Sequence, residues 1–122
     1  MKSLNRGDIV RVDFPDGDEI PSSEFDSPHP AVVIQNDTAN NRLETATVVP
    51  VTTNAYNGND YEVRLFPERD GVEEASVAKA NLIASISIRD RIINEEEWKM
   101  GEISPKKMDE LEAAIRSHIS IW

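Results

Sequence analysis

The sequence contains no cysteine among its 122 residues. Disulfide bonds, zinc sites built on thiolates and a cysteine nucleophile are therefore excluded. Histidine is scarce as well, because His29 and His118 are the only two, and they have no plausible metal-ligand spacing. We therefore expect neither a metal site nor a metal cofactor, and the absence of cysteine is consistent with a reducing compartment.

Long apolar runs are also missing from the sequence. The longest, such as the four residues 31–34, are far too short to span a bilayer. The first residues turn polar at once and contain no apolar stretch of signal-peptide length. We therefore expect a soluble, cytoplasmic protein that does not bind a membrane, folded as a single domain over residues 1–122.

Positive charge is in short supply, since 13 Lys and Arg stand against 23 Asp and Glu and leave a net charge of −10. Phosphate binding normally relies on clustered Lys and Arg, so the overall charge taken alone argues against a nucleic-acid partner. The acids gather in blocks, and the segment 16–26 holds several of them without a Lys or Arg. Such blocks are usually solvated faces, and a region that docks a basic partner is the alternative.

The hydrophobic pattern of the first two-thirds of the chain is typical of short strands separated by turns. Alternating or β-branched segments predict strands over residues 8–14, 30–35, 45–52, 61–66, 75–79 and 83–87. Pro50 cannot donate a hydrogen bond to a neighbouring strand, which predicts a sheet edge or a bulge at that position.

The last part of the sequence changes to helical periodicity. Ser104 is a good N-cap, and Pro105 suits the first helical position. Apolar residues then recur at helical spacing at Met108, Leu111, Ile115 and Ile119. Short strands followed by one terminal amphipathic helix predict a mainly β fold, a small and strongly bent barrel with the helix packed on it.

Five short segments stand in order along the chain: Arg6-Gly7-Asp8-Ile9-Val10, Pro30-Ala31-Val32-Val33-Ile34-Gln35-Asn36-Asp37, Val49-Pro50-Val51-Thr52-Thr53, Gly71-Val72 followed by Ser76-Val77, and Ile103-Ser104-Pro105 with the helix after it. Together they resemble the MazF/PemK/Kid family of toxin endoribonucleases over essentially the whole chain. The resemblance implies an SH3-like barrel of the CcdB/PemK type with a C-terminal helix. It also implies a homodimer that is sequestered by an antitoxin encoded alongside it.

Members of this family cut single-stranded RNA without a metal ion. The ribose 2′-hydroxyl attacks the adjacent phosphate, which leaves a cyclic phosphate and a 5′-hydroxyl. This chemistry needs a base, an acid and donors for the charge of the phosphorane. In the family, an Arg before the Pro of the second strand and the first Thr after Val-Pro-x supply much of this. Those positions are His29 and Thr52 here. Glu24 is a further candidate base, and a solvated loop residue is its alternative interpretation.

Contacts to RNA are expected from five other side chains: Thr53, Arg64, Lys79, Asn81 and Arg89. Thr53 would replace Thr52 if the strand register shifted by one residue. Lys79 keeps a cation where Kid-like members carry an arginine, whereas Asn81 stands where some members have an acid.

The histidine at position 29 leaves a second function open. Flanking prolines stiffen its backbone, and a histidine suits proton transfer, but it equally fits a lineage that has lost catalysis. The alternative is a non-catalytic member that binds an antitoxin or a protein target, as the related CcdB toxins do. A plain RNA-binding barrel is a third class, which the net charge disfavours. A homodimer is expected on physical grounds too, because an edge strand broken at Pro50 would leave apolar surface for a twofold partner.

Overall fold

The computed structural model describes residues 3–14, 29–53, 56–93 and 98–119. Its strands are β1 (Asp8–Val12), β2 (His29–Val33), β3 (Thr45–Thr52), β4 (Glu62–Leu65), β5 (Ser76–Lys79), β6 (Ala84–Ser87) and β7 (Lys99–Glu102). Its helices are α1 (Asp37–Asn40), α2 (Ile88–Arg91) and α3 (Pro105–Ile119), with a 3-10 turn, η1 (Ala80–Leu82).

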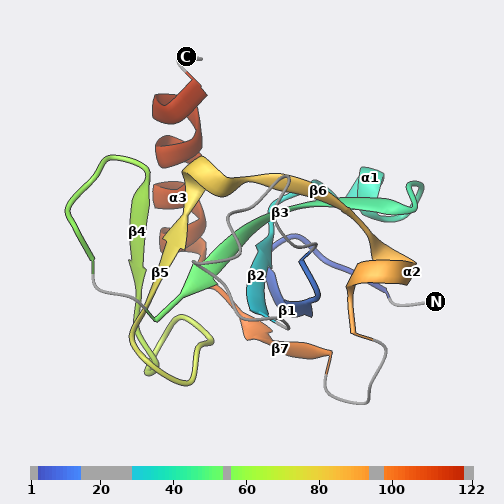
Figure 1. Ribbon diagram of the computed structural model, residues 1–122, viewed down its shortest axis with the longest axis horizontal. Helices are drawn as coiled ribbons and strands as arrows, with labels where there is room; N and C mark the ends of the chain where they lie inside the picture. Colours follow the sequence, from blue (N-terminus) through green and yellow to red (C-terminus); the bar gives the residue numbers. More distant parts are fainter. Residues whose placement is uncertain (1–2, 15–28, 54–55, 94–97, 120–122) are drawn as a thin grey trace.

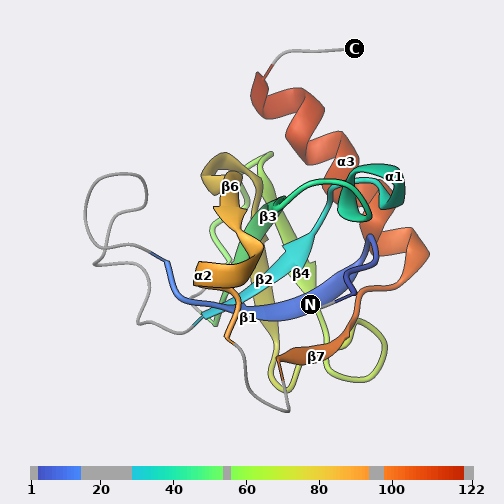
Figure 2. The ribbon, with the colours of Figure 1, turned by 90° about the vertical axis from the view of Figure 1, so that its right-hand side faces the viewer.

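The strands of the described residues form one antiparallel sheet in the order β4-β5-β3-β2-β1-β7, and β6 pairs with β3 outside this path. β3 is the centre of the arrangement, because it pairs with β2 on one side and with first β6 and then β5 on the other. The sheet curls as it passes from one partner to the next. Figure 1 shows α3 standing beside β4 and β5, with α1 and α2 at the opposite side of the molecule, and Figure 2 shows the curl from the side.

Hydrophobic side chains fill both faces of the central strands. Alternate residues of β1 divide between two clusters, with Val10 in one and Ile9 in the other. The first cluster also contains Val12, Val33, Val48, Ile86 and Ile92. The second packs under α3 and contains Val32, Val49, Val51, Leu65, Met108 and Leu111. Burial on both faces explains why β2 and β3 are continuous apolar runs.

The terminal helix follows its prediction closely. Ser104 Oγ accepts a hydrogen bond from the backbone N of Lys107 at 3.3 Å, as an N-cap does. Met108 and Leu111 are buried against the sheet, whereas Ile119 is 49% exposed, so the apolar stripe ends before the last turn. The expected mainly β, curled sheet with a C-terminal amphipathic helix is confirmed.

The position of Pro50 differs from its prediction. Pro50 is buried in the central strand, opposite Ala31 of β2, and the ends of the sheet path are β4 and β7. On its other side, Pro50 falls between the residues that pair with β6, which end at Val48, and those that pair with β5, which begin at Val51. Its missing N–H therefore removes no ladder bond. The prediction of an edge was wrong, and the physical argument for a homodimer that depended on it is withdrawn.

The turn before β1 is fixed by backbone and carboxylate contacts. Gly7 has a φ of +97° and donates its N–H to Val33 O at 2.7 Å. Asp8 is 1% exposed, accepts a hydrogen bond from Asn5 N at 2.9 Å and lies 3.2 Å from Lys99 Nζ of β7. A φ in this range favours glycine, because other residues are strained there. Gly7 and Asp8 thus join β1, β2 and β7.

Arg6 joins the same turn to the helices. Its guanidinium donates to Ile34 O at 3.0 Å and to Glu112 of α3 at 2.6 Å, and its backbone N donates to Asp37 at 2.7 Å. Each polar group of Arg6 described here is therefore used inside the fold. No helix in the described ranges is long and apolar enough to cross a membrane.

Candidate active site

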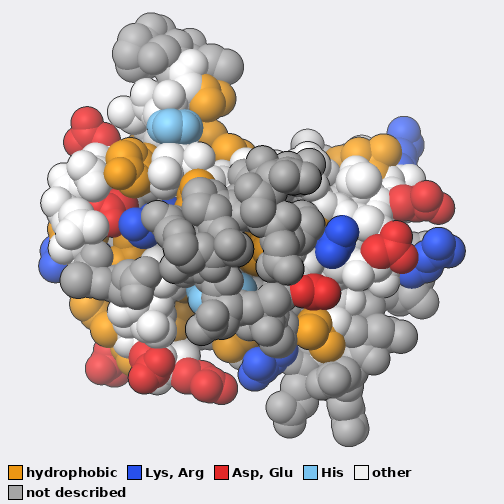
Figure 3. Space-filling model, in the orientation of Figure 1, with side chains coloured by type: hydrophobic (Ala, Val, Ile, Leu, Met, Phe, Trp, Pro, Cys, Tyr) orange, Lys and Arg blue, Asp and Glu red, His pale blue; other side chains and the backbone are white. Residues whose placement is uncertain are grey.

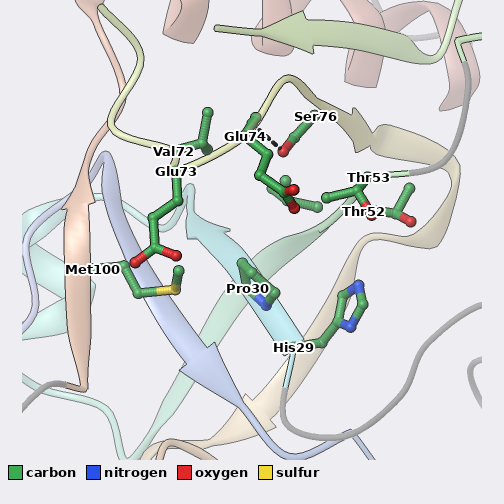
Figure 4. Close-up of a pocket in the computed structure, with 10 residues that line it drawn as sticks. His29, Pro30, Thr52, Thr53, Val72, Glu73, Glu74, Ser76 and Met100 are labelled. Atoms are coloured by element: carbon green, nitrogen blue, oxygen red, sulfur yellow. Dashed lines mark hydrogen bonds between the residues drawn. The ribbon is translucent and has the colours of Figure 1, made fainter. Parts of the chain in front are cut away.

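An open pocket of about 110 Å³ lies where β2 begins and β3 ends (Figure 4). Its lining consists of His29, Pro30, Val51, Thr52, Thr53, Val72, Glu73, Glu74, Ser76 and Met100. The structure thus brings three residues of the predicted site, His29, Thr52 and Thr53, to one pocket.

Strand register explains why His29 and Thr52 meet. β2 and β3 are antiparallel with Ala31 opposite Pro50, and two further residues along this register place His29 opposite Thr52. Directly opposed residues point to the same face, with Cβ atoms roughly 4.5–5.5 Å apart. In Figure 4 the side chains of His29 and Thr52 lie at the same end of the pocket.

The surroundings of these side chains differ in exposure. Thr52 is 4% exposed and is held by pairing with Val77 of β5, whereas His29 is half-buried at the first position of β2. Thr53 lies one residue beyond β3 and is exposed. An imidazole and a hydroxyl held by the ends of paired strands can transfer a proton and donate a hydrogen bond to a phosphate oxygen.

One wall of the pocket comes from the segment between β4 and β5. Figure 4 shows the side chain of Glu74 extending toward Thr52 and Thr53, and that of Glu73 extending toward Met100 of β7. Sequence reasoning missed both glutamates. The motif that flanks them, Gly71-Val72 and Ser76-Val77, was the available signal. It contributed to the family resemblance, but no site residue was predicted from it.

This wall is fixed to β7 by direct contact between two backbones. Gly71 has a φ of +74°, and a Cβ atom on it would collide with Glu102 O. A Cβ atom on Gly101 would lie only 2.6 Å from Gly71 O. Both positions therefore require glycine, one for conformation and space and the other for space.

Asp70 holds the start of the wall. It is fully buried, and it accepts hydrogen bonds from Phe66 N at 2.8 Å and from Ser104 Oγ at 3.0 Å. The same Ser104 caps α3. The wall of the pocket is thus connected to the first turn of the terminal helix.

Lys79 is engaged by a buried carboxylate. Its Nζ lies 3.5 Å from Glu62 Oε2, and Glu62 Oε1 accepts hydrogen bonds from the backbone of Asn59 at 2.9 Å and of Asn57 at 3.3 Å. Burial would raise the pKa of Glu62. The hydrogen bonds from Asn59, the charge of Lys79 and the amide of Asn57 outweigh burial and lower that pKa below its ordinary value. Lys79 lies on the same face of β5 as Val77 but outside the pocket lining.

The other side chains that were predicted to contact RNA lie on three different elements, all outside the pocket lining. Arg64 of β4 is exposed and pairs through its backbone with Val77, the partner of Thr52. Asn81 is half-buried in η1, outside the pocket lining. Arg89 is in α2, on the other side of the molecule from β4, and its exposed guanidinium lies 3.5 Å from Asp90 (Figure 1). Glu24 lies outside the described residues.

Comparison with known proteins supports the order of motifs found in the sequence. Residues 5–119 match the family described as "PemK-like, MazF-like toxin of type II toxin-antitoxin system". The chain is 32% identical over 124 residues to endoribonuclease MazF9 of Mycobacterium tuberculosis, with 98% of each chain covered.

Solved structures share the fold at lower identity. A MazF structure (Form-I) from Deinococcus radiodurans has a TM-score of 0.77 at 19% identity, covering 99% of this chain and 100% of that one. An endoribonuclease in complex with its cognate antitoxin, from a mycobacterial species, has a TM-score of 0.76 at 18% identity, covering 98% and 97%. The family match spans nearly the whole chain, and so the protein belongs to the PemK-like, MazF-like toxins of type II toxin-antitoxin systems.

Proposed function

We propose that the protein is a toxin that cleaves single-stranded RNA without a metal ion, at the pocket formed by His29 and Thr52. The observation that carries this proposal is the meeting of an imidazole and a hydroxyl at the ends of two paired strands, in a member of this toxin family. The relative MazF9 is named an endoribonuclease, which supports the same activity here.

The reaction assigns a role to each group. His29 takes the proton of the ribose 2′-hydroxyl, whose oxygen then forms a bond to phosphorus while the bond from phosphorus to the 5′-oxygen breaks. Thr52 donates a hydrogen bond to the phosphate oxygens, where negative charge grows in the transition state. The leaving 5′-oxygen needs a proton, for which Glu74 of the pocket wall is the candidate, and Glu24 is the alternative base for the 2′-hydroxyl.

Attraction of RNA has to be local, since the chain carries a net charge of −10. Figure 3 shows that, on the side of the molecule seen in Figure 1, acidic side chains are spread around the surface with basic ones between them. Lys79 is on β5, the strand next to Thr52, and Arg64 is on β4, one strand further. Thr53 is in the pocket itself, so these three suit the phosphates near the cut. Asn81 and Arg89 contact RNA only where its path continues beyond the pocket.

The test is cleavage of a defined RNA in the presence of a chelator. We expect products that end in a 2′,3′-cyclic phosphate and a 5′-hydroxyl, and no cleavage of the same sequence as DNA, which lacks the nucleophile. Arg42→Gln, an exposed change beside α1, serves as the control variant. A wild type that cleaves no faster than the double variant His29→Ala, Thr52→Ala would overturn the proposal.

A second candidate is a non-catalytic toxin that acts by binding a protein target. It is favoured by the charge of the pocket, which is lined by Glu73, Glu74 and a histidine but no arginine. Growth arrest on expression that persists in the His29→Ala variant, without cleaved RNA, would select this function.

The proposed partners are an antitoxin and a second copy of the chain. A mycobacterial relative of this fold has been solved with its cognate antitoxin, which supports the first. The second is implied by the family, and we expect the dimer to act in the cytoplasm, where RNA is available. Light scattering that gives only the 13.7 kDa monomer at micromolar concentration would contradict the homodimer.

A further inference from the structure

A cluster of aromatic rings and cations surrounds the end of β4, and of its members the proposed function uses Arg64 alone. We call it the aromatic–cation cluster and define it as Tyr56, Arg64, Phe66, Arg69 and Lys107. The Arg64 guanidinium lies 4.7 Å from the centre of the Tyr56 ring and 6.0 Å from that of Phe66. The Arg69 guanidinium and the Lys107 ammonium lie 5.1 Å and 5.5 Å from the Phe66 ring.

Strand pairing places Arg64 of this cluster on the same face of the sheet as Thr52. Arg64 of β4 is opposite Val77 of β5, and Val77 is opposite Thr52 of β3. Side chains opposite one another point to one face of a sheet. Neighbouring strands are roughly 4.8 Å apart, so two strand spacings put the Arg64 backbone roughly 10 Å from that of Thr52, a few nucleotides at most along a single strand.

The chemistry of the cluster suits a nucleic-acid base. Cations are scarce in this chain, yet three of them meet two aromatic rings here. Tyr56 is 42% exposed, so one face or edge of its ring remains accessible. Every base has a π-face, and stacking on aromatic rings together with cation–π contact from arginine is how single strands are held without sequence readout.

The alternative interpretation is that the cation–π contacts only stabilise the surface. Such contacts are worth about 0.5–1 kcal/mol each at exposed sites. That benefit needs no accessible ring, and it does not account for Arg64 lying in the same cross-strand row as Thr52. Position and exposure together favour a binding role.

We propose that the aromatic–cation cluster is a stacking site for a base of the RNA strand, a few nucleotides from the phosphate that is cut. This rests on the proposed function. Tyr56 and the guanidinium plane of Arg64 receive the face of the base, while Arg69 approaches the phosphates beside it. Lys107, which also pairs with Glu110 at 3.3 Å, packs behind Phe66. The site adds affinity and leaves the choice of cut sequence to the pocket.

The experiment compares two uncleavable probes of equal charge. One is a short 2′-fluoro oligouridine, which lacks the nucleophilic hydroxyl, and the other is an abasic oligonucleotide of the same length. Stacking is worth about 1–3 kcal/mol per base, so the wild type should bind the uridine probe about 5- to 150-fold more tightly than the abasic probe. Tyr56→Phe should retain this ratio because it keeps the ring, and Tyr56→Leu should lose most of it.

Two matched controls separate stacking from general effects. Leu43→Ala removes a side chain of similar exposure, 50%, from the loop after α1, and it should leave the ratio unchanged. Arg69→Gln should lower the salt dependence of binding by about one phosphate contact, whereas Arg42→Gln should not. Melting temperatures of Tyr56→Leu and Tyr56→Phe that agree would exclude unfolding as the cause.

The outcomes distinguish the stacking site from the proposed function. A wild type that cleaves RNA while its probe ratio equals that of Tyr56→Leu would overturn the stacking site alone, and would leave the cluster to a protein partner. A ratio that depends on the Tyr56 ring, in a protein that cleaves no RNA, would support the stacking site and overturn the catalytic proposal.

Discussion

Two motifs that contribute equally to the family resemblance, Arg6-Gly7-Asp8 and Val49 to Thr53, have different roles in the structure. In Arg6-Gly7-Asp8, the guanidinium, the glycine N–H and the carboxylate all bond to other parts of the fold. In the motif that ends at Thr52 and Thr53, the last side chains face a pocket. Matching a motif identifies the family, but contacts decide whether its residues support the fold or are available to a ligand.

The largest expected effect is at His29. His29→Ala should lower the rate of RNA cleavage by on the order of a hundredfold, because it removes the proton-transfer group, while RNA affinity and unfolding temperature change little. His118→Ala removes the other histidine, which is exposed on α3, and should leave the rate unchanged. A large loss of stability in His29→Ala would show that this residue supports the fold, as the Arg6-Gly7-Asp8 motif does.

The arginine that the family carries at this position gives a second test of His29. An arginine can stabilise the charge of the phosphate but is a poor base, whereas an imidazole can take a proton. His29→Arg should therefore cleave RNA faster than His29→Ala, because it returns a donor to the phosphate. Rates of wild type and His29→Ala that are equal would remove His29 from the reaction.

A smaller loss is expected at Thr52. Thr52→Ala should reduce the rate by about tenfold to fiftyfold, because one donor to the phosphate is lost, and Thr52→Ser should recover most of it. Thr45→Ala, at the exposed opposite end of β3, is the matched control. If Thr52→Ser is as slow as Thr52→Ala, the hydroxyl is not the group that matters and packing of the methyl is.

A substitution in the Arg6-Gly7-Asp8 motif should have the opposite effect, a loss of stability without a loss of cleavage. Asp8→Asn replaces a buried carboxylate that faces Lys99 and should lower the free energy of unfolding by on the order of 1–2 kcal/mol. Urea denaturation measures this, with Asp109→Asn on the exposed side of α3 as control. Cleavage per folded molecule should stay at the wild-type level, and a specific loss of rate would contradict the division between the two motifs.

The smallest expected effect is the contribution of Glu62 to the pH dependence of stability. Its pKa is lower in the folded protein than in the unfolded chain, so the ionised carboxylate stabilises the fold above the unfolded value, near pH 4.3 for a glutamate. That stabilisation is lost as the pH falls through the folded value. Unfolding measured from pH 6 to 3 should show a steeper fall for wild type than for Glu62→Gln, and parallel curves would contradict this.

The strands and the terminal helix could be predicted because their signals are local. The strand over 45–52 was found at its observed bounds from β-branched residues, and Ser104 was found from capping chemistry. β7 could not be found this way, since Lys99–Glu102 has no alternating pattern and becomes a strand only by pairing with β1. That pairing depends on residues distant in the chain, such as Asp8.

The candidate site divides in the same manner. His29 and Thr52 could be named from the motifs, but only the antiparallel pairing of β2 with β3 brings them to one pocket. Glu73 and Glu74 could not be assigned to the pocket, because nothing local to a polar loop shows which strands it will lie against. Arg89 has the charge of an RNA contact, and its place on α2 became known only from the fold.

The close approach of Gly71 and Gly101 has a consequence for genetic screens. In a library of single substitutions selected for survival of the toxin, both glycines should be recovered alongside His29, although neither carries a reactive group. Any side chain at either position would push the pocket wall away from β7. Such a screen would therefore recover positions that maintain the structure together with positions that carry out the reaction. Measuring the yield of folded protein from each survivor would separate the two groups.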